Sequence, residues 1–336
     1  MNLLQGHFAG FHRSVVFQSS RFLIQLSCFT LKGSQMIPLM MQHLLPLATL
    51  LLLSIIPTET EVVTSVAECN KFFLEKTPPN IRGILEGGTI LDQNRYKVIC
   101  QTLRNIRRFV TLYDTQNKIP VFSAAKYRVS SEGREPLWKI EPQLENTNYD
   151  DNMTPADKKI IYAHQAVITD YSGQQEFEKG HLFPSSYTCD VVDKRSTFTL
   201  TNAVPQRKLF NNRQWNMMES CVKCIMDNYC INNNYKTEGF VVIGAQPSNG
   251  NLLNKKVNIP SVLWSAFCCY SQNSWLASAH WGENTNDGPT YLQTKTLGEL
   301  HTELGIKAFP GTQCPNDISV TELYSEPACK DQCRQK

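Results

Sequence analysis

Three motifs that mark common enzyme classes are missing from this sequence of 336 residues. It contains no Gly-x-x-x-x-Gly-Lys-Ser/Thr, no His-Glu-x-x-His and no Gly-x-Ser-x-Gly. A nucleotide-binding loop, a zincin and a serine hydrolase therefore have no motif to support them. Internal repeats and long low-complexity linkers are absent as well. The length favours one large domain or two small ones, and nothing in the sequence requires a second.

A strong net charge is also lacking. Residues 1–67 hold three of the 33 basic and two of the 30 acidic residues, so the remainder carries a net charge of only +2. General attraction for polyanions is thus excluded, and nucleic-acid binding would depend on local basic clusters. Two clusters are present, of which we interpret the first as a solvated surface: Arg104, Arg107 and Arg108, and then Arg207, Lys208 and Arg213.

A hydrophobic segment of bilayer-spanning length is absent. The apolar run Leu44–Ile56 is shorter than the ~20 residues of a membrane span and has the length of a signal-peptide core. We predict that residues 1–67 form a presequence, with Met36 as the working start, and that residues 68–336 form a single secreted domain. After processing, no stable membrane span is expected, and a signal anchor is the structural alternative.

Cysteine, in contrast, is abundant, with twelve residues in the chain and eleven after the presequence. Behind a signal peptide this density predicts disulfides. Because eleven is odd, one thiol stays free or pairs outside the chain, for example in a disulfide-linked dimer. Zinc bound by Cys221, Cys224 and Cys230 is disfavoured, since no second ligand pair lies at the required spacing. The polar tail after residue 315 is expected to be held by Cys329 or Cys333.

The secondary-structure pattern is mixed. Six segments carry β-forming or alternating residues and predict strands: 95–101, 108–114, 120–127, 239–245, 262–270 and 275–280. A turn at 115–118 makes the second and third of these a hairpin. Helices are predicted from Thr154 to about Ala166, and from a capping box at Thr296 to Gly305. Because strands are grouped rather than alternating with helices, we predict an α+β fold with mostly antiparallel sheets.

The stretch from Phe177 to Lys223 carries most of the chemistry. It contains a histidine after a glycine, His181, a predicted strand over Ser196–Asn202 and a predicted helix that begins near Asn211. At 100° per residue Asn211 lies on the apolar stripe of this helix, which is formed by Trp215, Met218, Val222 and Ile225. A buried amide needs a hydrogen-bond partner or a metal ion, because leaving it unpaired costs about 1–3 kcal/mol.

Structural interpretations of these polar residues also exist. Asn211 could be a turn or N-cap residue, and a single histidine after glycine is more often structural than catalytic. What favours function is the ordered conjunction of Lys179-Gly180-His181, Asn202-x-x-Pro205-Gln206, Asn211, Trp215, Glu219 and Lys223. The sequon Asn152-Met153-Thr154 additionally predicts N-glycosylation at Asn152 in a surface loop.

This conjunction resembles the DNA/RNA non-specific endonucleases with a ββα-metal site. Their pattern is Asp-Arg-Gly-His, Asn-x-x-Pro-Gln and Asn-x-x-x-Trp-x-x-x-Glu, followed by a basic residue. The chain departs from it in the first motif, where Glu178 replaces Asp and Lys179 replaces Arg. More narrowly, the segments 95–101, 109–115 and 119–124 and Glu141-Pro142-Gln143 resemble the vertebrate endonuclease domain-containing 1 group.

The resemblance implies a disulfide-stabilised nuclease that hydrolyses DNA, RNA or both. In it, His181 is the general base, suited by the ordinary histidine pKa of about 6.5. Asn211 binds Mg²⁺, with Mn²⁺ as the alternative, and Glu219 holds metal-bound waters. Lys179 offers a point charge where arginine would clamp phosphate bidentately, which predicts weakened catalysis.

Further residues are assigned smaller roles. Lys223 assists from the helix, and Arg134 is a candidate second phosphate contact. Three basic residues around Asn211 are candidate substrate-binding residues: Arg207, Lys208 and Arg213. The alternative to an enzyme is a secreted binding protein that kept the nuclease fold and lost turnover, a reading supported by the changes at Glu178 and Lys179 and by the odd cysteine.

The secreted protein should begin between about Thr60 and Glu68. Ser65-Val66-Ala67 supplies small residues for signal peptidase, and cleavage nearer Thr60 is the alternative because that position lies closer to the apolar run. N-terminal sequencing of protein from the culture medium checks this expectation. An intact Leu44–Ile56 segment recovered in the membrane fraction would identify an anchor instead.

Overall fold

The computed structural model describes residues 61–128, 136–157, 160–271 and 273–320. Several sequence predictions fall outside these ranges and concern the apolar run Leu44–Ile56, Met36, Thr60, Arg134 and the tail cysteines Cys329 and Cys333. Residues 61–67 lie within the described fold, where the short strand β1 (Val62–Val63) pairs with β5 (Tyr96–Thr102).

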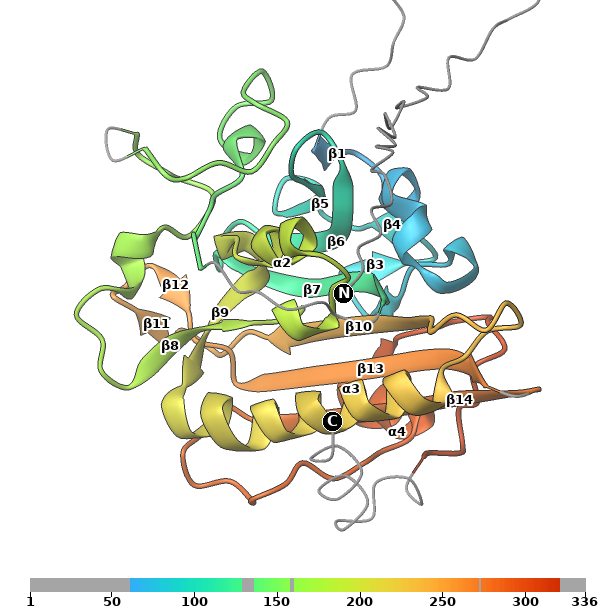
Figure 1. Ribbon diagram of the computed structural model, residues 1–336. Coiled ribbons are helices and arrows are strands. Elements are labelled where there is room, and N and C mark those ends of the chain that lie inside the picture. The colour runs from blue at the N-terminus through green and yellow to red at the C-terminus, as the bar shows by residue number, and fades with distance from the viewer. Residues whose placement is uncertain (1–60, 129–135, 158–159, 272, 321–336) are drawn as a thin grey trace, which may run out of the picture. The chain divides into compact units, whose positions relative to one another are not determined.

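A seven-stranded antiparallel sheet forms the centre of the fold (Figure 1). Its order is β1-β5-β6-β7-β10-β13-β14, with β6 at Arg107–Asp114, β7 at Ile119–Tyr127, β10 at Gly239–Gln246, β13 at Val262–Ser271 and β14 at Ser274–Glu283. All six strands predicted from the sequence are present within a few residues, and β6 and β7 form the predicted hairpin. The α+β class with antiparallel sheets is confirmed.

Three smaller sheets flank the large one. The first is four-stranded, in the order β15-β2-β3-β4, with β15 at Ile306–Lys307, β2 at Asn80–Ile81, β3 at Leu85–Glu86 and β4 at Thr89–Ile90. The other two are pairs, of β11 (Leu252–Leu253) with β12 (Val257–Asn258), and of β8 (Phe177–His181) with β9 (Ala203–Arg207).

In the described part of the chain, the α-helices are α2 at Val191–Thr197, α3 at Asn216–Tyr229 and α4 at Leu297–Leu304. A π-helical turn, η7 at Phe210–Trp215, leads into α3, and short 3₁₀ helices lie at Val66–Phe72, Leu74–Lys76, Pro142–Leu144, Ile168–Tyr171, Ser185–Tyr187 and Leu200–Asn202. Helix α4 has the predicted Thr296 capping box and ends at Gly305, whose φ of 73° is left-handed and favours glycine. Within the described residues, no helix is long and apolar enough to cross a membrane.

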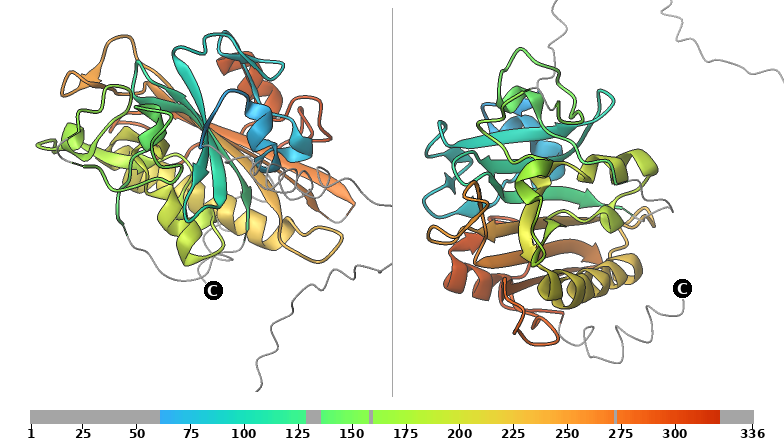
Figure 2. Two further views of the ribbon diagram at one scale, coloured as in Figure 1. Left: turned by 90° about the horizontal axis from the view of Figure 1, so that it is seen from above. Right: turned by 90° about the vertical axis from the view of Figure 1, so that its left-hand side faces the viewer.

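Both faces of the large sheet are buried. Along β10, Val241 and Ile243 belong to the core cluster that contains α3, whereas Val242 belongs to the cluster that contains α4, as the period of two in a strand requires. The two helices lie on opposite sides of the sheet (Figure 2). The predicted apolar stripe of α3 is confirmed, since Trp215, Met218, Val222 and Ile225 are each at most 5% exposed.

Disulfides between described cysteines connect these layers. Cys69–Cys100 joins the first 3₁₀ helix to β5, Cys230–Cys269 joins the end of α3 to β13, and Cys268–Cys314 joins β13 to the segment after α4. The predicted disulfide stabilisation is confirmed. The disfavoured zinc site is not formed, because Cys224 and Cys230 are both disulfide-bonded.

Two predicted elements are wrong. Ser196–Asn202 is not a strand but the end of α2 followed by a 3₁₀ turn, because the Asp190 side chain caps α2 by accepting from the Val192 and Asp193 amides. The helix expected from Thr154 to Ala166 is absent from the described residues of that range. There the Thr154 backbone pairs with Ile140, and the Glu145 carboxylate accepts hydrogen bonds from the amides of residues 163 and 164.

Two carboxyl groups are buried together beside the sheet. Glu61 and Glu141 are both 0% exposed, and the charge of Glu141 acts on the Glu61 carboxyl. Glu141 Oε1 also accepts hydrogen bonds from the Thr199 and Thr201 hydroxyls at 2.6 and 3.0 Å. Burial, followed by the charge of Glu141, raises the pKa of Glu61 well above its ordinary value. Glu61 is therefore held in its protonated form over a wider pH range than an exposed carboxyl.

This pair predicts a stability that falls as the pH rises. Because the pKa of Glu61 is raised in the folded state, its contribution to the free energy of unfolding is complete below the ordinary carboxyl pKa of 4.5. This contribution is lost as the pH rises from 4.5 through the folded-state pKa, at about 1.4 kcal/mol per pH unit. Glu61→Gln, whose amide donates without a titrating proton, should lose less stability over this range than the wild type. Thermal unfolding from pH 4 to pH 9 tests this.

The matched control for that experiment is Glu303→Gln, which changes an exposed carboxylate on α4 and should leave the pH profile unchanged. If Glu61→Gln and the wild type show the same pH profile, the pKa of Glu61 is not raised in the folded protein.

Candidate active site

A polar pocket of about 410 Å³ lies where β8, η7 and α3 meet. Five residues predicted from the sequence line it together: Glu178, Lys179, His181, Asn211 and Glu219. They come from two stretches of chain about 30 residues apart, so the convergence depends on how β8 is held against the rest of the fold.

The β8–β9 pair has a close backbone approach at Gly180. Strand residues Gly180 and Val204 are opposite one another, and the buried Gln206 side chain lies across Gly180. A Cβ atom at Gly180 would lie only 2.1 Å from Gln206 Cδ. Gln206 Nε2 also donates to the His181 carbonyl at 3.4 Å. The glycine before the histidine and the glutamine of the second motif are thus a packing pair.

Asn202 fixes the chain that follows His181. Its side chain is fully buried, and Oδ1 accepts from the Phe183 amide at 3.0 Å. Its Nδ2 donates to the carbonyls of Phe183 and Thr197 at 2.9 and 3.0 Å. Every donor and acceptor of this amide has a backbone partner, so the asparagine of the second motif is a scaffold residue.

Aromatic rings hold the His181 imidazole. The Trp138 ring lies 5.0 Å from it in a tilted arrangement, and the Phe198 ring lies 4.6 Å from it edge to face. The Lys179 ammonium lies 5.7 Å from the centroids of both Trp138 and Tyr171. Trp138 therefore orients two candidate catalytic side chains, and sequence reasoning gave it no role.

The Asn211 side chain is held through its nitrogen. Nδ2 donates to Glu178 Oε2 at 2.8 Å, and Asn212 Nδ2 donates to the same oxygen at 3.0 Å. With the nitrogen engaged, the amide oxygen Oδ1 is the end that remains to accept or to bind a cation. The substituted residue Glu178 is thus the direct partner of the predicted metal ligand.

The π-helical turn changes where Asn211 points. The sequence predicted this residue on the buried stripe of a regular helix, yet it is half-buried at the pocket wall. A π turn inserts one extra residue into the helical register, so the 100° rule fails across it. The prediction of an inward amide is therefore corrected, because Asn211 faces a pocket rather than the core.

Glu219 contributes a carboxyl group from the first turn of α3. Although the residue is partly accessible, burial of its carboxyl raises the pKa of Glu219 to about 8. Its backbone carbonyl accepts from the Tyr187 hydroxyl at 2.9 Å, which ties α3 to the segment after His181. A bound cation would favour the charged form of this carboxyl.

The donor set of the pocket fits a hard divalent cation. An amide oxygen and two carboxyl groups, of Asn211, Glu178 and Glu219, are oxygen donors of the kind that Mg²⁺ prefers. No group of three or more His, Cys, Asp or Glu residues with metal-binding geometry occurs in the described part of the chain. The pocket therefore suits an ion that keeps most of its waters rather than one held in a protein cage.

Other predicted residues do not line the pocket. Lys223 forms an ion pair with Asp227 at 2.5 Å, one turn further along α3, and Arg207 pairs with Glu176. Lys208 and Arg213 are both exposed. Lys208 lies in the connection between β9 and η7, and Arg213 lies within η7. Asn152 is partly exposed, with its amide donating to Asn105 and Asp150 side chains.

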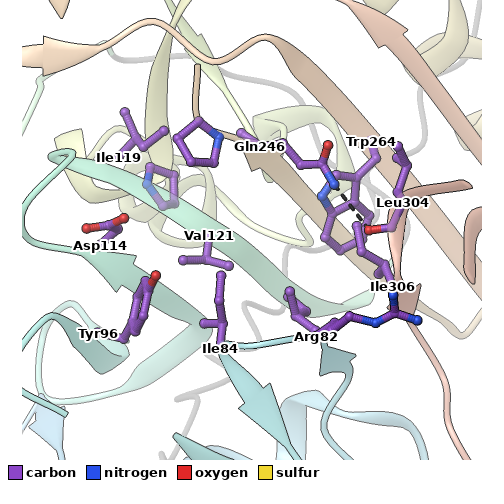
Figure 3. A pocket seen from close by; sticks show the side chains of 14 residues that line it. Arg82, Ile84, Tyr96, Asp114, Ile119, Val121, Gln246, Trp264, Leu304 and Ile306 are labelled. Carbon is purple, nitrogen blue, oxygen red and sulfur yellow. Dashed lines mark hydrogen bonds between the residues drawn. The ribbon is translucent and has the colours of Figure 1, made fainter. Parts of the chain in front are cut away.

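A second cavity, of about 310 Å³, has different chemistry (Figure 3). It lies over the face of the sheet that packs against α4, and its walls are mostly apolar, with Trp264 among them. Its carboxylate, Asp114, already accepts hydrogen bonds from Arg95 Nε and Nη2 at 3.0 and 2.6 Å. Gln246 donates to the Leu304 carbonyl at 3.2 Å. The polar pocket at β8 is thus the better candidate for catalysis.

The model of the DNA/RNA non-specific endonuclease family matches residues 87–309. The chain belongs to this family, and the resemblance predicted from the motifs is confirmed.

Among individual proteins, the chain is similar to the Endonuclease domain-containing 1 proteins of Homo sapiens and Mus musculus. Identity is 32% over 209 residues for the human protein, covering 60% of this chain and 39% of that protein. For the mouse protein it is 32% over 212 residues, covering 60% and 38%. The match spans well under half of each relative. A chain of the crystal structure of an EndoG/EndoGI complex is 16% identical with a TM-score of 0.46, covering 63% of this chain and 88% of that one.

The packing of Gly180 against Gln206 predicts the effect of a methyl group. Gly180→Ala should destabilise the protein by about 1–3 kcal/mol, because the new Cβ overlaps a buried side chain. Urea denaturation measures this cost. In the double variant Gly180→Ala/Gln206→Ala the cost of the alanine at 180 should shrink, and fully additive costs would contradict a direct contact.

Proposed function

We propose that this protein is a secreted, metal-dependent endonuclease that hydrolyses phosphodiester bonds in DNA, RNA or both, without sequence specificity. The observation that carries the proposal is the meeting of His181, Asn211 and Glu219 in one polar pocket. Family membership gives the reaction class, and the pocket supplies a base and oxygen ligands.

The proposed roles follow from the chemistry of hydrolysis. His181 accepts a proton from the attacking water, with its ring kept in place by Trp138 and Phe198. Asn211 would hold Mg²⁺, or alternatively Mn²⁺, through Oδ1, and Glu219 would hold waters of that ion. When bound, the ion would neutralise charge that develops on the phosphoryl oxygens.

The basic residues are proposed to contact substrate. Lys179 offers an ammonium group at the wall of the pocket, and Lys223 acts from α3. Four further residues are proposed phosphate contacts: Arg134, Arg207, Lys208 and Arg213. Because these charges would contact the sugar-phosphate backbone of the nucleic acid rather than the base edges, they would not distinguish one nucleotide sequence from another.

Secretion and a disulfide-linked partner remain part of the proposal. Disulfides form in oxidising compartments, which suits a secreted chain with N-glycosylation at Asn152. The odd number of cysteines after residue 67 suits an intermolecular disulfide.

A second candidate function is binding without turnover. The observation in its favour is that the Lys179 ammonium lies over two aromatic rings, where it offers less to a transition state than an arginine fork would. A protein with this site would bind nucleic acid and cleave it slowly or not at all.

His181→Ala should lower Mg²⁺-dependent cleavage of plasmid DNA and of RNA at least 10²-fold, because general-base catalysis contributes roughly 10²–10⁴-fold. Chelation should abolish wild-type cleavage. Lys179→Arg should raise the rate, since arginine donates two parallel hydrogen bonds to a phosphate. Initial rates of supercoiled plasmid nicking measure all three effects.

The control is His301→Ala on α4, which should cleave like the wild type. The double variant Glu178→Asp/Lys179→Arg should be measured beside the single variants, because Glu178 holds Asn211 and the two positions are adjacent on β8. If the wild type cleaves no faster than His181→Ala and the double reversion is equally silent, the binding protein is the correct function.

A further inference from the structure

A third pocket, of about 440 Å³, is lined by five basic side chains: Lys71, Arg107, Arg108, Lys126 and Arg128. They come from the first 3₁₀ helix, the start of β6 and the end of β7. We call this the basic pocket. It contains two of the three arginines that the sequence led us to interpret as a solvated surface. That interpretation is corrected, since both are half-buried in the pocket wall.

Positive charge is in excess here. The lining carries two carboxylates, of Asp190 and Asp193, and Glu238 adds a third through its ion pair with Lys126 at 2.5 Å. Asp193 pairs with Arg108 at 2.7 Å. Among the described residues that line the pocket, five carry positive charge and two carry carboxylates.

Arg128 is the cation best placed for a ligand. Its side chain is exposed, and no carboxylate in the described part of the chain forms an ion pair with it. The hydroxyls in the lining are used internally, since Thr188 donates to the Ser185 carbonyl and Ser196 donates to the Asp193 carbonyl. The pocket therefore offers guanidinium and ammonium groups, which recognise phosphate by charge.

The basic pocket adjoins the active site through one piece of chain. Pro184, Ser185 and Ser186 line the active-site pocket, while Phe183, Thr188 and Cys189 line the basic pocket. The seven residues from 183 to 189 span at most ~25 Å when fully extended. At about 3.4 Å of rise per nucleotide, this separation corresponds to roughly seven nucleotides or fewer.

We propose that the basic pocket binds a backbone phosphate of the polynucleotide a few nucleotides away from the bond that is cleaved. The proposal rests on the proposed function and deepens it. The ligand is the sugar-phosphate backbone, because point charges dominate the lining. The consequence is a substrate affinity that depends on length, with short oligonucleotides bound through the active site alone.

The test measures binding rather than cleavage. Fluorescence anisotropy with His181→Ala, in Mg²⁺, gives the affinity for a labelled 4-nucleotide and a labelled 16-nucleotide single strand over a range of salt concentrations. Adding Arg128→Gln should weaken binding of the 16-mer about fivefold at physiological salt and lower its log–log salt slope by about one. Binding of the 4-mer should not change.

The matched control is Lys307→Gln, which removes an exposed charge from β15 and should alter neither affinity. Equal losses for both lengths, or no loss for the 16-mer, would overturn the proposal, as would failure of the parent to bind the 16-mer. The two proposals fail separately. A wild type that binds the 16-mer through Arg128 but never cleaves refutes only turnover, and one that cleaves while Arg128→Gln binds normally refutes only the basic pocket.

Discussion

The burial of the central sheet on both faces is the constraint on which the rest of the fold depends. Each strand must supply apolar side chains in both directions, so neither face is left to solvent and each must be covered by its own layer. On one side this layer is α3 with the β8–β9 pair, and on the other it is α4 with the four-stranded sheet. The active-site residues therefore lie on the covering layer, which packing against the sheet holds in position.

Much of this arrangement was predictable because the secondary-structure preferences of the residues agree with the faces that they bury in the folded protein. The central strands carry β-forming residues, and the stripe of α3 matches the face it buries. The spacing of the motifs predicted residues that line one pocket, although two motif residues have a structural rather than a chemical role. Asn202 and Gln206 are fully buried and hold β8 and the chain after it in place. The second motif therefore marks residues that support the pocket rather than residues that line it.

The failures have equally specific causes. Residues 196–202 alternate polar and apolar side chains, but the alternation does not separate water from core, since Thr197, Thr199 and Thr201 are all 0% exposed. Their hydroxyls are satisfied by Lys194 and Glu141 instead. The side chain of Asn211 was predicted on the wrong face, because a helical wheel assumes a regular α-helix and does not account for a π turn. Trp138 was missed because its contacts with His181 and Lys179 exist only in the folded chain.

The neighbouring disulfides of β13 give the molecule a property that neither has alone. Cys269 is bound back to Cys230 and Cys268 forward to Cys314, so the two covalent loops overlap on consecutive residues of one strand. A protease that cuts the backbone at any one point between Cys230 and Cys314 leaves two fragments still joined by at least one bridge. A single backbone cut in this part of the chain would be invisible on a non-reducing gel, and α3 would stay covalently attached to β13.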